Sequence, residues 1–317
     1  MDAFIALTDK QWFDYLSTKA GAEGHLDEVN FWSPSSTMPL RQFVPGAPVF
    51  FRLKQPHSCI VGYGFFAHFS VLRLDQAWEW FGQKNGDPDE VRFLQRIGRY
   101  RHLDLLDKVT AKEPLGCNIL RDARLWPRER WIPWGKEQGW APNIVRGKTE
   151  RDPVRASRLL GEIQFDHQAP PEEFGEDFTP LDTDERRIRL SRAKQREGQG
   201  AFRARLLDAY DRQCAITNEH TEIVLEAAHI QPYLGPRSNH VQNGLLLTRE
   251  FHSLFDAGYV TVTPEHEVRI STRLRTEWGN GHRYYSFDGQ PLSLPADAAL
   301  RPSDEVLDWH STHRFRD

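Results

Sequence analysis

Cysteine is scarce in this sequence, and its three cysteines, Cys59, Cys117 and Cys214, stand far apart. This spacing excludes a disulfide framework and a four-cysteine zinc site, and it favours a cytoplasmic protein. No apolar run approaches the roughly 18 residues that a membrane span needs. The first ten residues also lack the basic and then apolar pattern of a signal peptide. The net charge of −4 excludes a uniformly basic nucleic-acid binder, although it is compatible with a local basic face.

The chain is long enough for two domains, with 317 residues of which 39% are hydrophobic and 27% charged. Charge separates sharply in the middle. Residues 162–185 contain nine acidic residues and no Lys or Arg, whereas residues 186–212 contain nine basic and three acidic residues. The acidic stretch also includes Pro170-Pro171, which favours a linker. The basic stretch is either a solvated face or an arm that contacts DNA phosphates. The candidate phosphate contacts are Arg192, Lys194 and Arg196.

The region before this linker is rich in β-branched and aromatic residues. Strands are expected over residues 43–51 and 59–74, broken by Pro and Gly into a strongly bent sheet. Helices are expected over residues 77–80 and 90–101. The apolar face of the second helix would hold Val91, Leu94, Ile97 and Tyr100. Residues 1–140 therefore predict an α+β domain.

The C-terminal third places polar side chains at the junctions of short elements. Residues 221–230 predict a strand that ends at His229, and the Pro- and Gly-containing residues 231–242 predict a loop. A second short strand after Asn243 leads into a helix over residues 249–257, which carries His252. Hydrolysis of a phosphodiester with one metal needs a base for the attacking water and a cation that neutralises charge on the phosphate. Two histidines beside such a loop are suitable for these roles.

The motifs of this region resemble those of HNH nucleases, which have a ββα-metal fold. They are CAIT (Cys214–Thr217), LEAAHI (Leu225–Ile230), NGLLL (Asn243–Leu247) and HSLFDAG (His252–Gly258). Residues 198–210 and 302–310 are similar to the flanks of the restriction-type branch, so the resemblance covers residues 196–317.

The resemblance implies a role for each matching residue. His229 would be the general base, Asn243 would brace the loop and orient that histidine, and His252 would bind the metal. Asp256 lies four residues after His252 on the same helix face and could be a second ligand or a partner of His252. Many HNH enzymes have a metal-binding Asp or His immediately before the base, whereas this chain has Ala228, and Glu226 on the same strand face is a candidate substitute. The family's paired cysteines are also missing, so no structural zinc is expected.

The N-terminal region carries an aromatic cluster within NFWSPSS, residues 30–36. Most aromatic side chains of such a domain must belong to its core. Together with VFFRLK and IVGYGFF, however, this cluster resembles the PUA-like fold, including its EVE and YTH branches, a bent β-barrel that takes one nucleobase, often modified, between aromatic walls. A base flipped out of a duplex needs aromatic faces to stack on and polar groups to read its edge. Trp32 is the candidate wall of this pocket, and Asn30, Ser33 and Ser35 are candidate edge readers.

Together the two resemblances imply a modification-dependent (type IV) restriction endonuclease. The expected domains are a base-reading domain at 1–140, an acidic and then basic linker at 141–195 and an HNH domain at 196–317. The expected cofactor is one divalent cation, Mg²⁺ or Mn²⁺. The expected partner is double-stranded DNA carrying 5-methyl- or 5-hydroxymethylcytosine, cut by a homodimer. Two alternatives stay open: a non-catalytic nucleic-acid-binding protein with a degenerate HNH domain, which Ala228 favours, and an RNA-directed nuclease.

Overall fold

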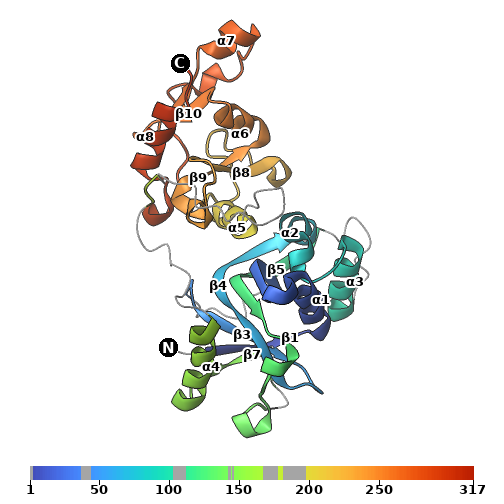
Figure 1. Cartoon of the computed structure of the whole chain (residues 1–317). Coiled ribbons are helices and arrows are strands. Elements are labelled where there is room, and N and C mark those ends of the chain that lie inside the picture. The colour runs from blue at the N-terminus through green and yellow to red at the C-terminus, as the bar shows by residue number, and fades with distance from the viewer. Residues whose placement is uncertain are drawn as a thin grey trace. The chain divides into compact units, whose positions relative to one another are not determined.

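A computed structural model describes residues 3–36, 44–102, 112–141, 144, 146–166, 178–180 and 198–317. The chain forms two compact units, residues 1–173 and residues 174–317 (Figure 1).

The N-terminal unit is built around a bent mixed sheet with the strand order β2-β5-β4-β3-β1-β7, and β6 pairs with β4. The strands are β1 (Ala3–Thr8), β2 (His25–Ser33), β3 (Pro48–Leu53), β4 (Cys59–Arg73), β5 (Pro114–Leu125), β6 (Ile132–Pro133) and β7 (Gly147–Glu150). The helices are α1 (Lys10–Ala20), α2 (Leu74–Phe81), α3 (Glu90–Arg101) and α4 (Pro153–Asp166). The β1–β3 pair is parallel, and the other pairs are antiparallel. Among the strands of the described residues, β2 and β7 are the two ends of this order, so no pairing closes the sheet into a barrel.

Alternation along the strands gives the sheet an apolar core on each face. In β1, Phe4 and Ala6 pack into one core with Trp12, Phe13 and Leu16 of α1. Ala3 and Ile5, the residues in between, pack into a second core with side chains of α4. Helices α1 and α4 accordingly cover opposite faces (Figure 1).

Two expectations about this unit differ from the structure. Residues 147–166 were expected to belong to a linker, but β7 pairs with β1, and α4 buries Ala156, Leu159 and Ile163 against the sheet. The predicted apolar face of α3 is correct at Leu94 and Ile97. Val91 and Tyr100, however, are 54% and 40% exposed, because α3 turns its Phe93 face to the core.

The C-terminal unit contains the predicted strand–loop–strand–helix arrangement. Its strands are β8 (Leu225–His229), β9 (Gly244–Thr248), β10 (Val260–Val262) and β11 (Val268–Ile270). Its helices are α5 (Gln199–Ala209), α6 (Arg249–Asp256), α7 (Arg273–Trp278) and α8 (Asp304–His313). Strands β8 and β9 are antiparallel, with His229 opposite Gly244. A Cβ on Gly244 would lie 2.6 Å from Leu206 Cδ1 and 2.7 Å from Phe202 Cζ, so a glycine is needed there for α5 to pack against the start of β9.

These elements confirm the predicted α+β class, with a bent sheet in the N-terminal unit and a ββα arrangement in the C-terminal unit. Within the described ranges, no helix is long and apolar enough to cross a membrane.

Candidate active site

His229 lies at the end of β8, between an aromatic ring and an amide. Its ring stacks on Phe202 of α5, with the centroids 4.1 Å apart and the planes at 13°. Its Nε2 lies 3.1 Å from Asn239 Oδ1 in the loop between the strands. An amide oxygen can only accept a hydrogen bond, so Nε2–H of His229 is the donor in this contact. The sequence did not single out Asn239, because it was one more polar residue in the 231–242 loop.

Asn243 is fully buried and braces the same loop from within. Its Oδ1 accepts from the backbone N–H of Gln231 at 2.8 Å. Its Nδ2 donates to the carbonyls of Gln231 and Ser238 at 3.1 and 2.9 Å. These bonds join the two ends of the loop. The amide that the His229 ring contacts is that of Asn239.

His252 of α6 lies between two carboxylates. Its Nδ1 is 2.9 Å from Glu226 Oε2 on β8, and its Nε2 is 3.4 Å from Asp256 Oδ2 one helical turn later. The two carboxylates that the sequence proposed as metal ligands, Glu226 and Asp256, therefore each contact His252, at different nitrogens of its ring. The Glu226 carboxylate accepts from Nδ1–H, and the other ring nitrogen, Nε2, is directed at the Asp256 carboxylate.

Glu226 is held as an anion by its neighbours. Partial burial opposes its ionisation, but hydrogen bonds from Arg249 Nε, at 2.8 Å, and from His252 outweigh burial and lower the pKa of Glu226. Ala228, which stands where many HNH enzymes have a ligand, is fully buried. In the described part of the chain, no three His, Cys, Asp or Glu side chains are grouped closely enough to hold a metal ion.

His310, a further histidine of the C-terminal unit, is part of its core. His310 stacks on Phe255 with the centroids 3.8 Å apart and is 2% exposed. Burial lowers the pKa of His310 to about 3, with a further contribution from Arg314, so it is a neutral packing residue. The candidate phosphate contacts Arg192, Lys194 and Arg196 lie outside the described residues.

The N-terminal unit contains an aromatic pocket of about 320 Å³. Trp32, Ser33 and Ser35, three of the four nominated pocket residues, line it. The other aromatic lining residues are Phe4, Trp12, Phe31 and Tyr100. Lys54 and Arg146 also reach the lining and add positive charge. Polar groups and aromatic walls therefore converge on a cavity at the small end of the usual size range of ligand sites.

Asn30, the fourth nominated residue, does not line this pocket. Its side chain is fully buried, and its Nδ2 donates to Asn85 Oδ1 at 2.8 Å and to Cys117 Sγ at 3.3 Å. These bonds hold the Asn30 side chain in the interior, beside Asn85 and Cys117. Asn118, opposite Phe31 on β5, lines the pocket instead and donates from Nδ2 to the Phe31 carbonyl at 3.0 Å.

Trp32 is fixed in place by several contacts. Its Nε1 donates to the Asn85 carbonyl at 3.0 Å. Phe93 and Tyr100 meet its ring edge-on, and the Arg96 guanidinium lies 5.3 Å from the ring centroid. This pocket wall is therefore preorganised before any ligand binds.

Comparisons with known proteins identify the class of the C-terminal unit. Residues 214–263 match the model of a family described as HNH endonuclease. This match contains His229, Asn243, His252 and both short strands, and it confirms the resemblance that the motifs indicated. The chain thus carries an HNH endonuclease domain, and it is a nuclease that hydrolyses phosphodiesters.

No curated protein matches the chain. Among solved structures, the chain is similar to an ASCH protein from Zymomonas mobilis at 12% identity and a TM-score of 0.33, over 51% of this chain and 94% of that one. It is also similar to a modification-dependent restriction endonuclease, TagI, at 10% identity and a TM-score of 0.26, over 92% of this chain and 76% of that one. Both TM-scores are too low to establish a shared fold.

Proposed function

We propose that the chain is a modification-dependent DNA endonuclease, in which the N-terminal unit binds a flipped, modified cytosine and the HNH domain cuts the backbone. The observation that carries this proposal is the aromatic pocket around Trp32, found in the same chain as a nuclease domain. A nuclease without target selection has no need of a preorganised aromatic cavity in a separate unit.

The pocket has the properties that base reading requires. A flipped base loses its stacking partners, and aromatic side chains such as Trp32 and Tyr100 can replace them. The hydroxyls of Ser33 and Ser35 supply donors and acceptors for the base edge. Lys54 and Arg146 are exposed cations of the lining, suited to the phosphate of the same nucleotide.

In the nuclease domain, His229 is the proposed general base. Its Nδ1 would take a proton from the attacking water, while Asn239 holds the Nε2 proton and thereby selects the tautomer. The stacked Phe202 ring restricts rotation of the imidazole. Asn243 acts through the backbone, because it holds the loop that carries Asn239.

A divalent cation, Mg²⁺ or Mn²⁺, suits the other side of the site. When bound, such a cation neutralises charge on the scissile phosphate and on the leaving oxygen. His252 Nε2 and Asp256 Oδ2 would hold it, since their 3.4 Å separation is compatible with neighbouring ligands of one cation. Glu226 orients His252 by accepting from Nδ1–H, as carboxylates commonly do for metal-binding histidines. Two protein ligands leave the remaining positions to water and phosphate, which is usual for Mg²⁺.

Each HNH domain cuts one strand, so a double-strand break by this chain requires two copies. We propose a homodimer on the DNA, which predicts that the ratio of double-strand breaks to nicks rises with protein concentration.

The test is digestion of matched DNA duplexes that contain cytosine, 5-methylcytosine or 5-hydroxymethylcytosine, with Mg²⁺ or Mn²⁺, using wild type beside His229→Ala. Cleavage that requires a modified cytosine, and that disappears with His229→Ala, is the expected result. Equal rates on all three duplexes would reject base reading and leave the nuclease assignment intact. Preferential cleavage of an RNA of the same sequence would reject DNA as the substrate.

A further inference from the structure

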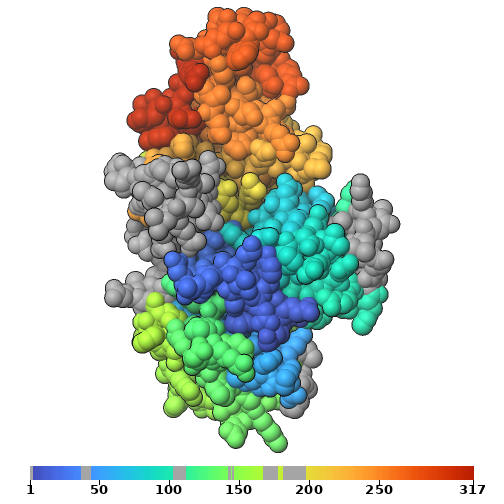
Figure 2. All heavy atoms as spheres, turned by 45° about the vertical axis from the view of Figure 1, so that its right-hand side comes forward, coloured from blue at the N-terminus to red at the C-terminus, as the bar shows by residue number. Residues whose placement is uncertain are grey.

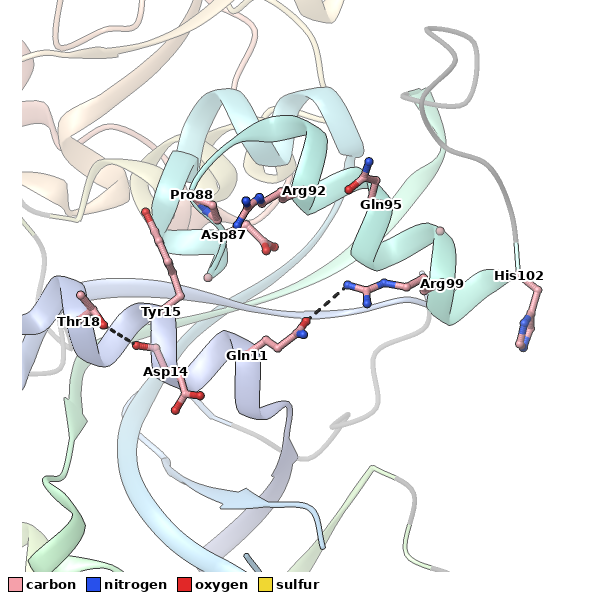
Figure 3. Close-up of a pocket in the computed structure, with 12 residues that line it drawn as sticks. Gln11, Asp14, Tyr15, Thr18, Asp87, Pro88, Arg92, Gln95, Arg99 and His102 are labelled. Carbon is pink, nitrogen blue, oxygen red and sulfur yellow. Dashed lines mark hydrogen bonds between the residues drawn. The ribbon is translucent and has the colours of Figure 1, made fainter. Parts of the chain in front are cut away.

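A second and larger cavity lies beside the aromatic pocket, in the groove between α1 and α3 (Figure 3). Its volume is about 1220 Å³, compared with about 320 Å³ for the pocket. Side chains of Gln11, Tyr15 and Thr18 come from α1, and Arg92, Gln95 and Arg99 come from α3. The α1 and α3 atoms that flank it lie side by side on one face of the unit, in dark blue and teal (Figure 2). Most of the residues that line the groove are polar or charged, and its volume is too large for one base, so it suits a longer, charged ligand.

The acidic groups of the groove are already paired with other cations. Asp87 is hydrogen-bonded to Arg96, which is 2% exposed and belongs to the interior. Asp14 accepts from Lys10 Nζ at 2.8 Å. Both carboxylates are thus largely compensated within the unit.

The two arginines of the groove have weaker contacts with the rest of the unit. Arg92 is highly exposed, and the carboxylate of Asp89, itself an exposed residue, lies 3.8 Å from its guanidinium. Arg99 donates to an amide oxygen, Gln11 Oε1, at 3.5 Å. In Figure 3 both guanidinium groups reach into the space between the helices. The groove therefore offers positive charge to a ligand, and guanidinium groups are well suited to phosphate oxygens.

The groove and the aromatic pocket share the same two helices. On α1, Gln11 lines the groove and Trp12 lines the pocket. On α3, Arg99 lines the groove and Tyr100 lines the pocket. At the border, Tyr100 donates to Asp9 Oδ2 at 2.5 Å and so joins the end of α3 to the start of α1. A base in the pocket stays covalently joined to its neighbours, so its strand must continue over a surface adjacent to the pocket.

We propose that the α1–α3 groove binds the phosphodiester backbone of the DNA strand that supplies the flipped base, with Arg92 and Arg99 contacting its phosphates. This inference rests on the proposed base-reading function. Because phosphate contacts carry no sequence information, the groove contributes affinity and register, whereas the aromatic pocket contributes selectivity.

The experiment measures DNA binding by the full chain carrying His229→Ala, which prevents cleavage during the titration. Duplexes with and without one 5-hydroxymethylcytosine are titrated over a range of salt concentrations. The test variant combines Arg92→Gln with Arg99→Gln. The matched control combines Arg128→Gln with Lys136→Gln, which removes the same charge from exposed positions of the same unit outside the groove.

The expected result is a loss of affinity of about tenfold for both duplexes at moderate salt, with an unchanged ratio between them. The slope of log K against log salt should become shallower by about 1.8, since each phosphate contact contributes about 0.9. The control pair should change the slope much less. The double variant Arg92→Lys, Arg99→Lys keeps both positive charges and should keep most of the salt dependence. It therefore distinguishes an effect of charge from a disturbance of the structure.

A groove variant that matches the control pair in affinity and slope would overturn the proposal. Loss of discrimination between the duplexes without a change of slope would overturn it as well, because the arginines would then act on the base. If the parent protein binds both duplexes equally, base reading fails, and the slope comparison still reports whether the groove holds a backbone.

Discussion

The candidate nuclease site takes its polar side chains from residues 226–256, whereas the aromatic pocket takes its lining from segments spread between Phe4 and Arg146. In the first region, the side chains proposed for the reaction contribute little to the hydrophobic core, because His229, Glu226 and His252 are only partly buried. In the second they overlap, since Phe4, Trp12 and Phe31 also pack into a hydrophobic core. Substitutions in the nuclease site should therefore report on chemistry, and those in the pocket on binding and stability together.

The largest effect is expected for His229→Ala. Loss of a general base lowers cleavage rates by about 10²- to 10⁴-fold. DNA binding and the thermal unfolding midpoint should hardly change. Single-turnover cleavage of modified DNA measures the effect, with His220→Ala, an exposed histidine of the same unit, as the control. An unchanged cleavage rate for His229→Ala would show that His229 is not the general base.

Trp32→Ala should have the next largest effect and a different signature. Loss of one stacking surface is worth about 1–3 kcal/mol, so preference for modified over unmodified DNA should fall by about tenfold to a hundredfold. Trp32→Phe keeps an aromatic face, although it loses the bond to the Asn85 carbonyl, and it should retain most of the preference. Competitive binding with both duplexes measures this ratio, and equal losses on both would place Trp32 outside the base contact.

Asn239→Leu tests whether the loop amide orients the base. Without the acceptor on Nε2, both tautomers become accessible, and kcat should fall by about tenfold with little change in KM. Asn239→Asp keeps an acceptor and should restore most of the activity. If Leu and Asp variants are equally impaired, Asn239 supports the loop rather than the tautomer.

The smallest expected effect is on the pH dependence of the stability of the C-terminal unit. The folded pKa of His310, about 3, is lower than the ordinary value of about 6.5, so the unfolded chain binds the extra proton first. Stability is therefore fully present above pH 6.5 and is lost as pH falls from there towards 3, by about 1 kcal/mol between pH 7 and pH 5.5. Thermal unfolding of wild type and His310→Gln at both pH values measures this, and the variant should show a smaller decrease. Parallel curves would show that His310 does not control the loss.

The contrast between the regions also explains what could be predicted from sequence. His229, Asn243 and His252 were found because the nuclease motifs are short and stand at fixed spacing along the chain. Asn239 was missed because nothing local distinguishes it from the other polar residues of its loop. Asn118 was missed and Asn30 misassigned because the pairing of β2 with β5, a long-range contact, decides which asparagine faces the pocket.

Strand β7 and helix α4 lie in residues that were expected to form a linker. Residues 147–150 show no apolar alternation, and their place is set by pairing with β1. The spacing of Ala156, Leu159 and Ile163 is typical of a helix. It was overlooked because the acidic residues that follow favoured a linker.

The stacking of Phe202 on His229 has a practical consequence for protein engineering. Phe202 belongs to α5, which precedes every matched nuclease motif, and a Cβ on Gly244 would collide with it. A truncated nuclease that begins at Cys214 would keep the complete HNH signature and lose the ring that stacks on His229, the proposed base. An isolated nuclease domain should therefore start no later than Gly198. Domains cut at the motif boundaries alone should be inactive, because they lack the Phe202 ring that stacks on His229.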